Sequence, residues 1–263
     1  MGTDAEVFLF DHDAYLRVVV PTFLKFLEDS TVVDWLQPFV KRRELEPSLW
    51  DKSDLTRYLT ALNPDFSWPA HYDLNYTYEK NWKERWSDFV GASLHPVPAD
   101  ELVEQVNWLF KIAVSIKCVG ECQFVGRSRT TAHYSELLPD LGVKEDDRVV
   151  ELLAALGKRG FLISYQFGFG FEGINGWLDP LETAELAKRL DMLALPRYEV
   201  SFAAMQQFRT GEWGAYECPD FSSEALSLSF VRTAATIAAR EHRGLLWGNG
   251  VMPREFYLSA SSL

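Results

Sequence analysis

The sequence predicts an α+β protein, a predominantly helical single globular body with a small β-sheet. Helical periodicity recurs along most of the 263 residues, whereas short apolar runs typical of strands are few. The helices are not regularly interleaved with strands, which disfavours a doubly wound parallel sheet. Hydrophobic residues make up 47% of the chain, enough for one large domain to bury a core. We expect one domain over residues 1–263, with the Gly-rich and polar stretch 120–141 as the place for any sub-domain boundary.

Helices are predicted where apolar side chains recur every three or four residues. Asp11 or Asp13 can cap the first helix, and Pro21 is expected to kink or divide it. Asp179 followed by Pro180 marks the start of a later helix, because proline suits the first helical position. The predicted helices cover approximately residues 11–28, 31–40, 53–62, 100–117, 144–158, 180–193 and 222–242.

Strands are predicted where a short apolar or β-branched run is bounded by turn signals. The segment 71–86 has a period that fits strand and helix equally, and 198–208 is either a short helix or a strand leading into one. The predicted strands are residues 6–10, 161–167, 244–247 and 256–258.

Acidic side chains outnumber basic ones, with 38 Asp and Glu against 26 Lys and Arg, and the formal net charge is −12. Phosphate backbones repel such a surface unless a local basic patch overrides the mean charge. The chain has one short basic run, Lys41-Arg42-Arg43, with Glu44 directly after it. Cations in this setting are typical of a solvated helix end. We therefore expect no nucleic-acid partner.

The N-terminus lacks the features of an export signal. Its first residues carry no basic group, and the apolar patch 7–10 is too short for the core of a signal peptide. The longest apolar stretch, around 18–27, contains Pro21 and Lys25, so we expect no membrane-spanning segment and no membrane association. Three cysteines, an odd number, do not make a disulfide framework. These features predict a cytoplasmic protein.

A glycine pattern at residues 168–173, Gly-Phe-Gly-Phe-Glu-Gly, has the spacing of the dinucleotide-binding fingerprint. In that fingerprint the helix begins inside the glycine run, so that its free amides face the pyrophosphate. Here the helix start is marked at Asp179, well beyond Gly173. Alternation of Phe with Gly is more typical of a strand with a bulge or hairpin. The context therefore disfavours a nucleotide site.

Cys118 and Cys122 lie four residues apart, and Cys218 with His133 would complete a Cys₃His zinc site. The spacing is looser than the familiar two-residue knuckle, and no second pair follows. Cysteine is also among the residues most often buried as a small hydrophobe. We favour inert buried thiols and predict no cofactor, with a zinc site and a reactive thiol as the alternatives.

Asp11, His12 and Asp13 stand at a predicted strand-to-helix junction and are the candidate catalytic residues. A carboxylate beside an imidazole can set its tautomer and raise its basicity. Adjacent side chains seldom point the same way, however, and Asp is an ordinary helix cap. Capping and turn formation are therefore favoured over chemistry.

The aromatic segment 63–86 is the candidate binding surface. Most aromatic stripes are core, but polar residues interleave these rings and would leave some of them near the surface. Exposed rings make effective anchors at protein interfaces. The candidate binding residues are Trp68, His71, Tyr72, Tyr76, Trp82 and Trp86.

The sequence leaves open whether the protein is an enzyme. It contains no nucleophile elbow, phosphate-binding loop, His-Glu-x-x-His motif or kinase signature. The favoured hypothesis is a non-enzymatic binding protein of the immunity or inhibitor kind, whose acidic surface and aromatic anchors dock a basic protein partner. The alternative is an enzyme that uses thiol, zinc or paired-carboxylate chemistry in an aromatic-lined pocket.

Overall fold

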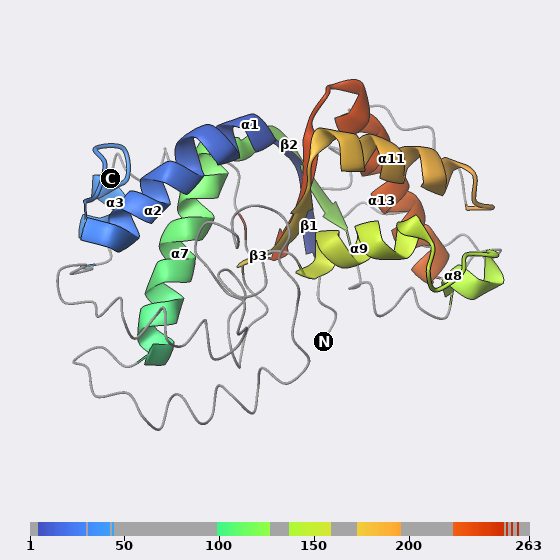
Figure 1. Ribbon diagram of the computed structural model, residues 1–263, viewed down its shortest axis with the longest axis horizontal. Helices are drawn as coiled ribbons and strands as arrows, with labels where there is room; N and C mark the ends of the chain where they lie inside the picture. Colours follow the sequence, from blue (N-terminus) through green and yellow to red (C-terminus); the bar gives the residue numbers. More distant parts are fainter. Residues whose placement is uncertain are drawn as a thin grey trace.

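Figure 1 shows the computed structural model, in which a small sheet stands between two layers of helices. The predominantly helical α+β class is confirmed. The residues that the structure describes are 5–29, 31–42, 44, 99–126, 137–158, 173–195, 223–249, 251, 254 and 257.

Four strands that are far apart in sequence form the sheet. They are β1 (Ala5–Phe10), β2 (Val119–Gly126), β3 (Gly173–Leu178) and β4 (Gly244–Asn249). Their order is β2-β1-β4-β3, and every neighbouring pair is antiparallel. Because the strands come from distant parts of the chain, the sheet holds the helices that connect them in one body.

The two central strands, β1 and β4, confirm the strands predicted over 6–10 and 244–247. The two outer strands were not predicted. β2 includes Gly120 and Gly126, and β3 includes Gly173 and Gly176. In the sequence alone, a glycine suggests that a strand is interrupted. Glycine weakens a strand but is tolerated where a bulge or a close approach of backbone requires it, and β3 is bulged between Ile174 and Gly176.

The first helix is continuous but not uniform. It consists of α1 (His12–Ala14), a π-helical turn η1 (Tyr15–Val19) and α2 (Val20–Asp29). The N–H of Val20 donates to the carbonyl of Tyr15, five residues earlier. Pro21 accounts for this wider turn, because proline has no N–H and its ring collides with the carbonyl four residues before it. Pro21 was expected to kink or divide this helix; the structure shows no division at Pro21 but a widened turn just before it.

Two helices begin later than their apolar periodicity predicted. α3 runs over Gln37–Arg42, although the pattern started at residue 31, and Pro38 stands in its first turn, where no N–H is needed. α9 covers Arg148–Lys158, after the short α8 (Leu137–Asp140), although the pattern started at residue 144. The Asp147 carboxylate accepts the N–H of Val149 at 2.8 Å, so a capping side chain sets the start of α9.

The remaining described helices match their predicted positions. They are α7 (Ala99–Cys118), α11 (Pro180–Asp191) and α13 (Ser223–Arg240). α11 has a capping box, in which the Asp179 carboxylate accepts the Glu182 N–H at 2.7 Å and the Glu182 carboxylate accepts the Asp179 N–H at 3.1 Å. The predicted cap at this position is therefore confirmed.

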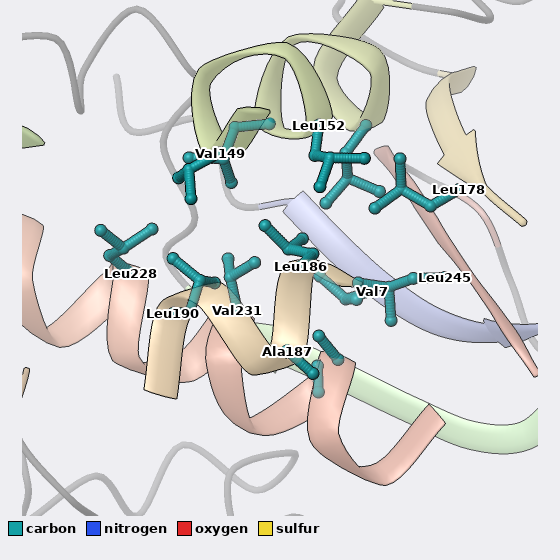
Figure 2. Close-up of a cluster of buried hydrophobic side chains, with 14 of the residues drawn as sticks. Val7, Val149, Leu152, Leu178, Leu186, Ala187, Leu190, Leu228, Val231 and Leu245 are labelled. Atoms are coloured by element: carbon teal, nitrogen blue, oxygen red, sulfur yellow. The ribbon is translucent and has the colours of Figure 1, made fainter. Parts of the chain in front are cut away.

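α9, α11 and α13 cover one face of the sheet, and Figure 2 shows the apolar cluster between them. The strands contribute Val7, Leu178 and Leu245, and the inward side chains of the three helices close over them. α9 buries the apolar side chains that recur at helical spacing in its sequence; they are Val149, Leu152, Leu153 and Leu156.

The opposite face of the sheet packs against the first helix and α7 (Figure 1). Successive side chains of a strand alternate between faces, so Phe8 and Phe10 are buried on this side while Val7 and Leu9 belong to the cluster of Figure 2. The C-terminal half of α7 is buried around most of its circumference. Apolar side chains that recur at helical spacing in this half are all buried; they include Leu109, Phe110, Ala113 and Ile116.

Other predictions differ from the structure or lie outside the described residues. Tyr257, the described member of the strand predicted over 256–258, is helical, so that strand is wrong. Gly173 begins a strand and the next helix starts at Pro180, so no helix opens at the end of the glycine pattern. Outside the described residues lie the predicted helix 53–62, the strand 161–167 and the segments 71–86 and 198–208.

Candidate functional site at the end of strand β1

Asp11 connects four segments of the chain at the end of β1. Its backbone N–H donates to the Cys118 carbonyl at 2.7 Å, where α7 passes into β2. Its carboxylate accepts the Ala14 N–H at 2.9 Å, which caps α1. The same carboxylate forms an ion pair with Arg243, which lies between α13 and β4. The favoured structural role of Asp11, helix capping, is therefore present.

The surroundings of Asp11 keep its carboxyl group ionised. Partial burial favours the neutral form, but the Ala14 N–H and the Arg243 guanidinium outweigh it and lower the pKa of Asp11 below its usual value. A carboxylate with a lowered pKa that already accepts two hydrogen bonds is a weak general base. Asp11 is thus suited to holding a positive charge and a helix end in place.

The side chains of His12 and Asp13 make contacts different from those of Asp11. Asp13 is exposed and pairs with Arg17 one helical turn later, at 3.3 Å. The His12 ring is partly buried and stacks on Tyr15, with 6.2 Å between ring centroids. The three candidate catalytic residues therefore occupy three separate environments, and the two carboxylates are paired with different arginines.

An aromatic cluster lies beneath this junction. Tyr15 is its centre: its ring centroid is 5.1 Å from that of Trp177, 5.4 Å from Phe10 and 6.4 Å from Phe110. These rings come from η1, β3, β1 and α7, and Tyr15, Trp177 and Phe10 are fully buried. The cluster fixes the first helix and α7 against the sheet, as tilted and edge-to-face ring pairs do in protein cores.

Cys118 is buried at the end of α7. Burial raises the pKa of its thiol well above the usual value, the Asp11 carboxylate raises it further, and Lys117 opposes them. The group is therefore a neutral thiol at neutral pH and a poor nucleophile or metal ligand.

The side chains of the other three members of the candidate zinc site lie outside the described part of the chain. Cys122 is in β2, but its side chain lies outside what the structure describes, as do His133 and Cys218. Within the described ranges, no three His, Cys, Asp or Glu side chains are grouped so that they could hold a metal ion. The candidate binding residues also fall outside the described ranges; they are Trp68, His71, Tyr72, Tyr76, Trp82 and Trp86.

Arg243 is the member of the junction that sequence reasoning missed. It follows the predicted helix and precedes a predicted strand, where a basic residue is unremarkable. The pairing of β1 with β4 places Phe10 opposite Gly244, which brings the preceding Arg243 beside the following Asp11. The only local signal was that each residue flanks a predicted strand.

A network of charged side chains joins α9 to α11. Arg148 contacts Glu185 at 3.4 Å, Arg189 contacts the same carboxylate group at 2.9 Å, and Arg189 also reaches Asp147 at 3.4 Å. Close to this network, three carboxylates are exposed: Asp140 is the last residue of α8, and Glu145 and Asp146 lie between α8 and α9, next to the exposed Lys144. We call the three acidic residues the acidic segment.

Among the helices that the structure describes, none is long and apolar enough to cross a membrane. Comparisons with protein-family models, with curated proteins and with solved structures find no match to this chain.

Proposed function

We propose that this protein is a non-enzymatic binding protein of the immunity or inhibitor kind, which docks a basic protein partner. The observation that carries the proposal is the net charge of −12, together with the exposed carboxylates of the acidic segment. A surplus of one charge sign steers an oppositely charged partner and raises the association rate. The acidic segment is one place where a basic surface would be attracted.

The state of the candidate catalytic groups supports binding over catalysis. The Asp11 carboxylate holds Arg243 and a helix cap, and the lowered pKa of Asp11 makes it a weak base. The Cys118 thiol is buried and has a raised pKa. Asp11 and Cys118 therefore serve the fold, and neither is an activated base or nucleophile.

Aromatic side chains would supply the contact energy after the first encounter. Interface energy is concentrated in a few residues, among which Trp and Tyr are enriched. The proposed anchors are Trp68, His71, Tyr72, Tyr76, Trp82 and Trp86.

The proposal is tested by capturing partners from a lysate of the source organism on the immobilised full-length chain, at low and at high salt. We expect a protein of basic isoelectric point whose retention falls as salt screens the attraction. The Glu145→Lys/Asp146→Lys variant should weaken the purified pair at least tenfold in an equilibrium binding assay. The matched control, Asp34→Lys/Glu241→Lys, makes the same charge change at two exposed positions outside the acidic segment.

Three results would count against the proposal or against its location. If no partner is captured, or if binding is insensitive to salt, the electrostatic docking function is wrong. If both double variants weaken binding equally, the net charge drives association and the acidic segment has no special part in it.

A further inference from the structure

We draw no further inference here: the strongest candidate, the outward face of α11 with the exposed side chains of Leu181 and Met192, carries no proposal because nothing in the described part of the chain shows what covers it.

Discussion

Replacing Gly176 with alanine is the most direct test of how α9 packs on the sheet. Gly176 lies in β3, and a Cβ added there would stand 2.8 Å from the carbonyl carbon of Leu156 and closer still to the carbonyl oxygens of Ala155 and Leu156. All three atoms are backbone atoms of α9, so no side-chain rotation can relieve the collision. The helix must move away from the strand, which would also loosen the apolar cluster beneath it.

The expected cost follows from the nature of the contact. Overpacking a core costs typically 1–3 kcal/mol, and a collision with rigid backbone belongs at the top of that range, about 3 kcal/mol. With a urea m-value of about 3 kcal/mol/M, the midpoint of unfolding should fall by roughly 1 M. The assay is equilibrium unfolding in urea, followed by tryptophan fluorescence and far-UV circular dichroism, with the m-value fitted for each variant.

Gly142→Ala is the matched control. Gly142 has φ +79 and nothing within 4 Å of the added Cβ, so only its backbone conformation opposes the substitution. We expect a loss of about 1 kcal/mol there, the usual penalty for a non-glycine residue in the left-handed region. If Gly176→Ala is no more destabilising than Gly142→Ala, then α9 does not lie against β3 at this point, and the packing described for this face is wrong.

Three further predictions concern single side chains at element ends. Asp179→Ala removes the capping box of α11 and should lower the free energy of unfolding by about 1–2 kcal/mol in thermal or urea melts, whereas Asp179→Asn should keep most of it. His242→Gly should raise that free energy by about 0.5–1 kcal/mol, because His242 has φ +53 at the end of α13, where glycine is preferred; a loss would contradict this. The pKa of Asp11 is lower in the folded protein than its ordinary value of 3.8, so its carboxylate stabilises the fold above that value and loses this contribution as pH falls through the folded pKa. The urea midpoint of the wild type should therefore fall more steeply below about pH 4 than that of Asp11→Asn, and equal slopes would refute the ion-pair argument.

Where a structural signal is local, the sequence predicted the structure well. The start of α11 follows from Asp179 and Pro180, because a cap and a proline act on the first turn alone. The central strands β1 and β4 follow from apolar runs beside turn signals, since a strand buried on both faces is apolar throughout. The starts of α3 and α9 were placed too early, because periodicity continues through residues that a proline or a capping aspartate excludes from the helix.

The candidate site was predicted only in its individual parts. Asp11 was recognised as a cap or a catalytic residue, and the first of these roles is present. Its partner Arg243 could not be recognised, because 232 positions separate the two in the chain (243 − 11) and only the β1–β4 register joins them. The depth of burial that raises the pKa of Cys118 likewise comes from packing, which no local motif records.

By itself, the sequence determined the helical character of the chain, the surplus of negative charge, the two central strands and the caps at Asp11 and Asp179. Each of these depends on side chains within a few residues of one another or on composition alone. Only the tertiary structure decided that the glycine-containing strands β2 and β3 complete the sheet, that α9 rests on Gly176, and that Asp11 meets Arg243. Those features form only when distant segments pair. The free energy of that pairing depends on both segments together, so neither segment's sequence specifies it alone.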